Sequence, residues 1–255
     1  MNLLSDIKAA VRYVFSRKGL LSLALVNMFF SFFIGGFIAV DTGESETRIC
    51  AALILIPFLL LSLLADELVS LVVLCRVKSD ESSTPFSMGW KYLGRYIAQT
   101  MLLSVAFVAA VVSSVLLSVV IASFSKLLAV FFISPVFCAI FYLSIRLALG
   151  PSIIVLADMG VMESLSESWR VTRGRMMYLA GAAIILALVS SVISISDSAL
   201  TLVFKALGIL ILKKLFINPA AGFLTGLLSI IFTVFLARFY LQAAAAEKAG
   251  GKAAK

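Results

Sequence analysis

Two adjacent carboxylates, Asp66 and Glu67, lie inside a long apolar run and are the side chains best suited to chemistry. Along a helix they fall about 13 Å before Arg76, where a charge facing lipid costs at least about 2.5 kcal/mol. One interpretation is a site for a proton or cation. The other, which we favour, is a buried ion pair, or hydrogen-bonded carboxylates, that fix helix packing. The candidate partners inside other apolar runs are Arg146 and Arg238.

A second set of residues combines tryptophan with basic side chains. Ser87–Lys91 and Ser166–Arg170 both follow the pattern Ser-x-x-Trp-basic, and a Gly-Arg pair comes shortly after each. Tryptophan sits at headgroup depth in a bilayer, and Lys and Arg meet anionic lipid there. The sequence therefore gives these candidate anionic-lipid contacts: Trp90, Lys91, Arg95, Trp169, Arg170, Arg173 and Arg175.

Signatures of enzyme chemistry are missing from the sequence. It has no histidine and no GxSxG, Walker A or HExxH motif. Its cysteines (Cys50, Cys75 and Cys138) form no CxxC pair and are typical of small packing residues. We predict no catalytic residues, no cofactor and no metal site.

The elements that would carry these residues are membrane spans. The chain is 62% hydrophobic and 13% charged, whereas soluble domains are nearer half apolar and a quarter charged. The apolar residues form runs long enough to cross a bilayer. They predict an all-α membrane protein with six spans, at about 19–40, 49–75, 96–122, 127–150, 176–196 and 219–241, in a single domain over 1–255.

The distribution of basic residues predicts the orientation of these spans. Most Lys and Arg fall in the N-terminal stretch, in 76–95, in 151–175 and at the C-terminal end, whereas 41–48 is acidic. The positive-inside rule then places both termini in the cytoplasm, as an even number of spans requires. The net charge of +8 is explained by this pattern, so we predict no nucleic-acid partner.

Three amphipathic stretches come just before spans on the predicted cytoplasmic side. Their apolar stripes recur at helical spacing, and we expect three interfacial helices there. The stripes are Leu4, Ile7, Val11 and Val14; Phe86, Trp90, Leu93 and Ile97; and Met162, Leu165, Trp169, Thr172 and Met176. Gly150-Pro151 predicts a break followed by a plain loop. The apolar but charged stretch 197–218 predicts an outer interfacial helix, with a seventh span as the alternative.

The region around the Gly150-Pro151 break also resembles a known family. A small-Pro break, an apolar stretch, the acidic-x-Gly turn Asp158-Met159-Gly160 and then serines and an arginine on a helix are similar to YciC-type bacterial inner-membrane proteins. The segment Phe235–Tyr240, with Arg238, resembles that family's last helix. Related helices form the membrane part of some glycerophosphodiester phosphodiesterases. The resemblance covers 148–190 and 225–241, and it implies a six-span protein of the bacterial inner membrane without implying an activity.

Three classes of function stay open at this point. The first is a non-enzymatic role in membrane homeostasis or lipid interaction, with anionic lipids as partners. The second is a small-solute or ion transporter or channel subunit, which would use the intramembrane charges. The third is a scaffold subunit of a membrane complex, with another membrane protein or a second copy of the chain as its partner.

Overall fold

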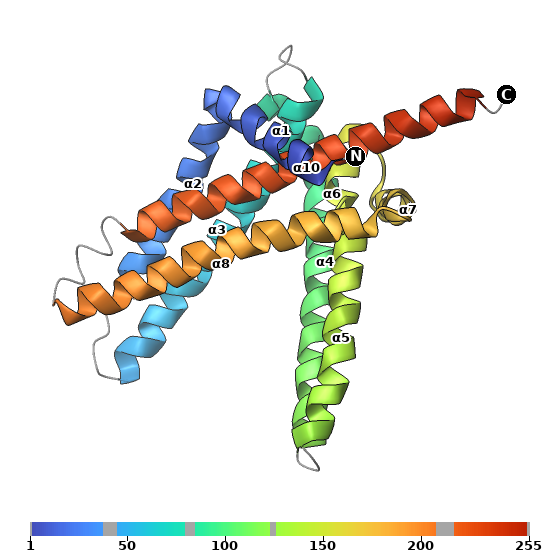
Figure 1. Cartoon of the computed structure of the whole chain (residues 1–255). Helices are drawn as coiled ribbons and strands as arrows, with labels where there is room; N and C mark the ends of the chain where they lie inside the picture. The colour runs from blue at the N-terminus through green and yellow to red at the C-terminus, as the bar shows by residue number, and fades with distance from the viewer. Residues whose placement is uncertain (1, 38–44, 80–84, 123–125, 208–216, 254–255) are drawn as a thin grey trace. The chain divides into compact units, whose positions relative to one another are not determined.

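The computed structural model describes residues 2–37, 45–79, 85–122, 126–207 and 217–253, and over these ranges its regular structure is helical. Figure 1 shows the helices. They are α1 (Leu3–Ser16), α2 (Lys18–Phe37), α3 (Ser45–Ser79), α4 (Pro85–Ala122), α5 (Lys126–Leu147), α6 (Gly150–Ala157), α7 (Val161–Thr172), α8 (Met176–Ala206) and α10 (Asn218–Ala253).

The six predicted spans correspond, in chain order, to the long helices α2, α3, α4, α5, α8 and α10. Within the described residues, four segments are long and apolar enough to cross a membrane: Gly89–Leu117, Cys138–Ala157, Met176–Phe204 and Asn218–Glu247. The span predicted at 19–40 extends beyond the described residues, and the span predicted at 49–75 lies within α3. Both stay predictions as membrane crossings, although Lys18–Phe29 is a shorter apolar helix.

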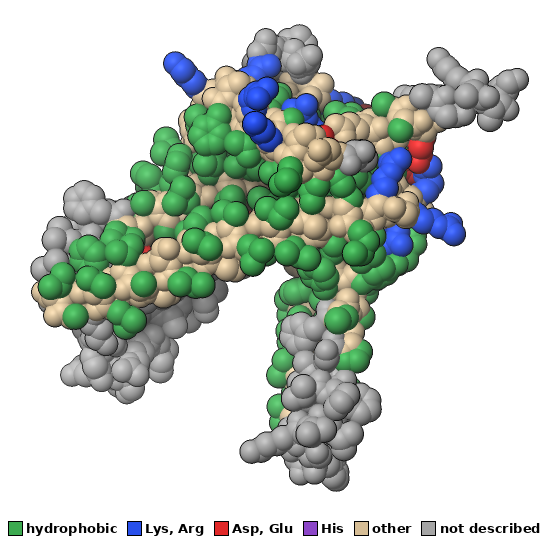
Figure 2. Space-filling view, viewed as in Figure 1, with side chains coloured by type: hydrophobic (Ala, Val, Ile, Leu, Met, Phe, Trp, Pro, Cys, Tyr) green, Lys and Arg blue, Asp and Glu red, His purple; other side chains and the backbone are tan. Residues whose placement is uncertain are grey.

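Large apolar side chains are exposed along two of these segments. Leu116 on α4 is 63% exposed, and Leu202 on α8 is 70% exposed. Figure 2 shows hydrophobic side chains along α8 and the α4–α5 hairpin, while Lys and Arg gather over α1 and beside α7. A water-soluble protein rarely exposes apolar surface on this scale. Together with the four apolar segments, this makes the chain a multi-span integral membrane protein.

Contacts between residues divide the chain into two compact units. The first unit comprises Met1–Asp80 and Gly181–Phe235, and the second comprises Glu81–Ala180 and Leu236–Lys255. Each unit is described separately below. The prediction that 1–255 form a single membrane domain stays a prediction.

In the first unit, α2 and α3 pack antiparallel. The guanidinium of Arg76 lies against Gly19, where an added Cβ would be 3.1 Å from its Cζ atom. Further along α2, the Asn27 Nδ2 atom donates a hydrogen bond to Asp66 Oδ1 on α3 at 3.1 Å. Gly19 pairs with Arg76 and Asn27 pairs with Asp66, so residue numbers increase along α2 while they decrease along α3. The two contacts therefore show that the helices run antiparallel, and they define the register.

In the second unit, α4 and α5 form a hairpin, and α6 and α7 pack on them. The expected loop after Gly150-Pro151 is wrong, because this stretch forms helix α6 with Pro151 in its first turn. A proline there lacks only an N–H that has no partner within the helix. The apolar residues Ile153, Ile154 and Val155 are fully buried, and their burial stabilises this short helix.

The predicted interfacial helices form in two of three places. Helices α1 and α7 are separate short helices, as expected. The second predicted interfacial helix is not separate, because α4 runs without interruption from Pro85 to Ala122. Gly89 and Gly94 are the weakest helix formers in that stretch after Pro85, and each costs only about 1 kcal/mol.

The predicted outer helix at 197–218 also differs from the structure. Its first part is the continuation of α8, which ends at Ala206. Residues 208–216 lie outside the described residues, and α10 begins at Asn218.

Candidate functional site

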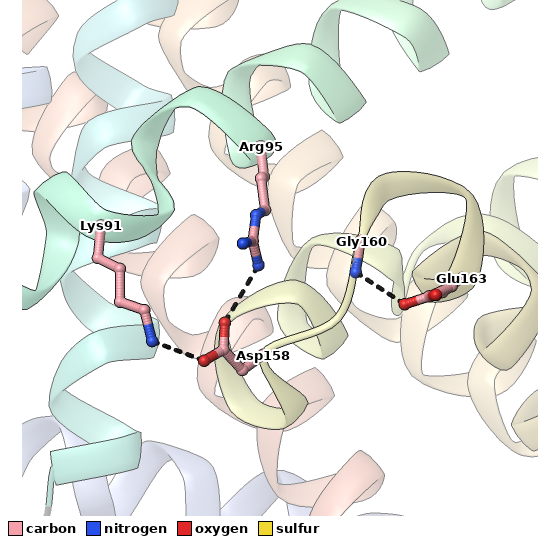
Figure 3. A network of polar contacts seen from close by, with 5 residues as sticks. All are labelled: Lys91, Arg95, Asp158, Gly160 and Glu163. Atoms are coloured by element: carbon pink, nitrogen blue, oxygen red, sulfur yellow. Dashed lines mark hydrogen bonds and ion pairs between the residues drawn. The ribbon is translucent and has the colours of Figure 1, made fainter.

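A carboxylate held by two cations lies at the end of α6. Asp158 Oδ2 is 2.6 Å from Lys91 Nζ, and Asp158 Oδ1 is 3.1 Å from Arg95 Nη1. Lys91 and Arg95 share one face of α4 because they are four residues apart, and Figure 3 shows both reaching the same carboxyl group. We call this arrangement the Asp158 clamp. It ties the end of α6 to the first turns of α4.

The backbone conformation of Asp158 ends α6, three residues before α7 begins. Asp158 has a φ of 56°, in the left-handed region, which Asp tolerates better than most residues do. Two residues later the backbone N–H of Gly160 donates to Glu163 Oε2 at 3.2 Å. Figure 3 shows this contact at the start of α7. The acidic-x-Gly turn therefore ends one helix and begins the next.

Helix α7 buries a face made of small polar side chains. Ser164, Ser168 and Thr172 are fully buried or nearly so, whereas Met162 is 70% exposed. Of the predicted stripe, Met162 and Trp169 are exposed, as expected for a stripe that faces lipid, whereas Thr172 is buried. Ser168 donates its hydroxyl to the carbonyl oxygen of Arg146 at 2.6 Å. Hydroxyls of this size allow close helix approach and satisfy each other inside a membrane protein.

Arg146 fastens α7 to α5. Its Nε donates to the Tyr142 hydroxyl at 3.0 Å, and its Nη1 donates to the Trp169 carbonyl at 3.2 Å and to Thr172 Oγ1 at 3.3 Å. The guanidinium also lies 4.9 Å from the centre of the Trp169 ring, a cation–π distance. Arg146 is therefore engaged within the second unit. Its predicted pairing with Asp66 or Glu67, which belong to the first unit, stays a prediction.

Under α7 lies a buried amide that sequence reasoning missed. Gln99 is fully buried, and its Oε1 accepts a hydrogen bond from Ser164 at 3.4 Å. Its Nε2 has no hydrogen-bond partner within the described ranges. The same amide lies against Gly150, where an added Cβ would be 3.1 Å from Gln99 Cδ. The absence of a side chain at Gly150 leaves room for Gln99.

The charged side of α7 forms an ionic triad. Arg170 Nη2 is 2.7 Å from Glu167 Oε1, and Arg170 Nη1 is 2.9 Å from Glu247 Oε2 on α10. The hydrogen bond from Arg170 lowers the pKa of the Glu167 carboxyl below its ordinary value, and the two carboxylates raise the pKa of Arg170. Arg170, a predicted lipid contact, is therefore neutralised by side chains of its own chain.

The turn between α7 and α8 presents two more predicted contacts, Arg173 and Arg175. Gly174 lies between them with a φ of 77°, a conformation that glycine adopts without strain. Arg173 is exposed. Arg175 is half-buried, and its Nη1 is enclosed without a hydrogen-bond partner among the described residues. The candidate span Met176–Phe204 begins at the next residue.

Both tryptophans stand outside the packed core. Trp90 is 67% exposed and Trp169 is 43% exposed. Each lies beside basic residues, as the sequence predicts, namely Lys91 and Arg95 for Trp90 and Arg173 for Trp169. Exposed indole rings next to cations are typical of a membrane–water interface.

In the first unit, Asp66 has an uncharged partner. Its hydrogen bond comes from Asn27, an amide on α2 that sequence reasoning missed. Gly226 on α10 lies against Asn27, where an added Cβ would be 2.8 Å from the Asn27 Cβ atom. Three helices therefore meet around this polar pair. Glu67 and Arg238 are half-buried, and their roles stay predictions.

Some missed residues carried a sequence signal. Asp158 stands two residues before a glycine and follows a run of apolar residues, a position that ends a helix. Gln99 and Glu247 carried none, because their partners Ser164 and Arg170 lie more than 60 residues away in the chain. Among the described residues, no group of three His, Cys, Asp or Glu side chains could hold a metal ion.

Comparisons with known proteins give one match. No curated protein and no solved structure matches the chain. A family model described as a domain of unknown function (DUF7847) matches residues 87–243, more than half of the sequence. The matched range includes the Asp158 clamp, Gln99, Arg146, α7 and the Arg173–Arg175 turn. The chain therefore belongs to the DUF7847 family.

Proposed function

We propose that the protein is a non-enzymatic membrane protein that binds anionic lipid headgroups on one face of the bilayer. The observation that carries this proposal is the Arg173-Gly174-Arg175 turn at the start of α8. Arg173 is exposed and Arg175 is half-buried, directly before the candidate span Met176–Phe204. A lipid phosphate near this turn would supply oxygen acceptors in the geometry that guanidinium groups favour.

The nearby carboxylates show which of the candidate lipid contacts keep a net positive charge. Arg170 is shared by two carboxylates, Glu167 and Glu247, so it has no surplus charge for a lipid. Lys91 and Arg95 share the single carboxylate of Asp158, which leaves one positive charge in excess. Arg173 and Arg175 add two more at the turn. These four residues and the two exposed tryptophans support a headgroup surface.

The test is lipid retention by the full chain released from nanodiscs. The nanodiscs contain equal amounts of phosphatidylglycerol and phosphatidylcholine with identical chains, and native mass spectrometry identifies the lipids kept by the protein. Each basic residue near an anionic surface contributes about 1 kcal/mol. We expect Arg173→Gln to lower the preference for phosphatidylglycerol about fivefold and Arg173→Glu, which changes the charge by two units, about thirtyfold.

The control is Lys252→Glu, which changes the net charge of the chain by as much as Arg173→Glu does. A preference for phosphatidylglycerol that Lys252→Glu leaves intact supports a defined contact at the turn. Equal losses in both variants, or no preference in the unchanged protein, would contradict the proposal.

The orientation and location follow from the same proposal. We place six spans in a bacterial inner membrane, with both termini, α1, α7 and the first turns of α4 on the cytoplasmic side, where basic residues concentrate. The resemblance of residues 148–190 and 225–241 to YciC-type inner-membrane proteins supports this placement. Another membrane protein or a second copy of the chain is compatible with it as a partner.

A second candidate function, transport of a proton or small cation, is favoured by the contact between Asn27 and Asp66. The negative charge of a carboxylate beside a neutral amide is not neutralised by its partner, so the carboxylate can bind a proton or cation. A carboxylate paired with arginine is already neutralised. If Asp66 carries protons, Asp66→Asn abolishes proton flux into liposomes that contain a pH-sensitive dye, while the variant stays folded because an amide can still accept from Asn27. Unchanged flux would remove this candidate.

A further inference from the structure

An open groove runs between α4 and α5 in the second unit. It has a volume of about 360 Å³ and is almost entirely apolar. On α4 it is lined by Leu103, Phe107 and Ala110 among others, and on α5 by Ile140 and Leu143, and it ends at Pro151 in the first turn of α6. Its volume lies within the range of pockets that hold small ligands.

The groove opens on the side of two candidate spans. Its α4 wall belongs to Gly89–Leu117 and most of its α5 wall belongs to Cys138–Ala157. Several lining residues, including Ala106 and Phe107, are exposed. In a multi-span membrane protein, such an open apolar surface faces lipid chains. An apolar cleft on such a surface is filled by a lipid acyl chain, because the hydrocarbon region of the bilayer contains no water that could fill it.

The position of the groove along α4 matches the depth of one lipid leaflet. Leu103 lies about 12 Å beyond Arg95 along the helix axis, and Ala110 about 22 Å beyond it. A leaflet has roughly 5–7 Å of headgroup region followed by about 15 Å of hydrocarbon. Arg95 and Ala106 are also eleven residues apart, which is close to three full turns, so they point in nearly the same direction.

A positive surface lies at the headgroup end of the groove. Lys91 and Arg95 are about half exposed, with 59% and 48% of their side-chain surface accessible, and they share one carboxylate. The excess positive charge complements a phosphate. The exposed indole of Trp90 stands at the same end of α4, at the depth that tryptophan favours.

We infer that the α4–α5 groove binds one acyl chain of an anionic phospholipid whose phosphate lies at Lys91 and Arg95. This inference rests on the proposed function and deepens it, because it adds a chain site to the headgroup surface. Apolar contact inside a membrane gains little free energy over contact with other lipid, so the groove selects by fit while the cations select by charge.

The experiment uses the full chain in nanodiscs of phosphatidylglycerol that carries a photoactivatable diazirine in the middle of one acyl chain. After illumination, mass spectrometry of the peptides locates the crosslinks. We expect crosslinks to concentrate in the stretches 103–110 and 140–148. Ala106→Phe fills the groove from an exposed position and is expected to reduce these crosslinks about threefold or more.

The matched control is Ala109→Phe, the same change at an exposed position of α4 that does not line the groove. If Ala109→Phe leaves the crosslinks unchanged while Ala106→Phe removes them, the inference stands. Crosslinks spread evenly over the exposed faces of α4, α5 and α8, or lost equally in both variants, would show bulk lipid only and overturn it. The preference for phosphatidylglycerol, measured separately with Arg173→Glu, shows whether the proposed function itself holds.

Discussion

Replacing Gly226 with alanine is expected to lower the free energy of unfolding by about 1–3 kcal/mol. Gly226 is buried on α10. An added Cβ would be 2.8 Å from the Cβ of Asn27 and 3.1 Å from its Cγ. A Cβ atom moves only with its backbone, so α2 and α10 must move apart. That shift also strains the hydrogen bond from Asn27 to Asp66, which leaves a half-buried carboxylate poorly satisfied.

The measurement is unfolding by sodium dodecyl sulfate from mixed micelles, followed by circular dichroism. The control is Gly94→Ala on α4, where an added Cβ meets nothing within 4 Å. That change should stabilise the protein by about 0.5–1 kcal/mol, because alanine is the better helix former. The two substitutions are chemically identical and should have opposite signs. A Gly226→Ala variant as stable as Gly94→Ala would contradict the close approach of α2 and α10.

Replacing Gly150 with leucine is expected to cost about 3 kcal/mol and to detach α7. Gly150 is fully buried, with the amide of Gln99 on one side and Leu165 Cδ2 3.4 Å from an added Cβ on the other. Gly150→Ala should cost much less, because the end of the Gln99 side chain can shift. A leucine needs more room than that shift provides. Detachment is measured as faster tryptic cleavage after Arg170 and Arg173.

A double variant makes this prediction specific to the contact. Gln99→Ala removes the side chain that the leucine meets, so Gly150→Leu with Gln99→Ala should regain part of the stability lost by Gly150→Leu alone. Residues in contact show such coupling, whereas distant residues add independently. Strict additivity of the two changes would mean that Gln99 does not occupy the space next to Gly150.

The long helices could be predicted from the sequence because membrane spans need only length and apolar composition. Helix α6 was missed because Gly150-Pro151 has the composition of a break, and the burial of Ile153–Val155 that stabilises a helix there is a tertiary effect. Helix α7 was predicted as an amphipathic helix, and the exposure of Met162 and Trp169 agrees with a stripe that faces lipid, but the small hydroxyls that it buries were not predicted. Apolar periodicity identifies the core face of a helix in a soluble protein. In a membrane protein the apolar side can face lipid, and small hydroxyls pack inward.

The candidate site could be predicted only in part. Tryptophans beside cations were recognisable, and Trp90 and Trp169 are exposed as an interfacial role requires. The internal partners of those cations were not recognisable. Asp158 lies 63 residues after Arg95, and nothing local indicates that the two side chains meet. The same limit applies to Asn27. Its hydrogen bond to Asp66 could not be predicted, because the two residues lie 39 positions apart in the chain.

The polar underside of α7 has a thermodynamic consequence. Three of the four residues that α7 buries, Ser164, Ser168 and Thr172, are polar and the fourth is Val171, while Met162 and Trp169 already stand outside. Exposing polar surface lowers the heat capacity and exposing apolar surface raises it. Release of α7 therefore changes the heat capacity less than release of an equally large apolar face would, and its free energy is closer to linear in temperature. The docking of α7 then weakens steadily on warming instead of passing through a pronounced temperature optimum.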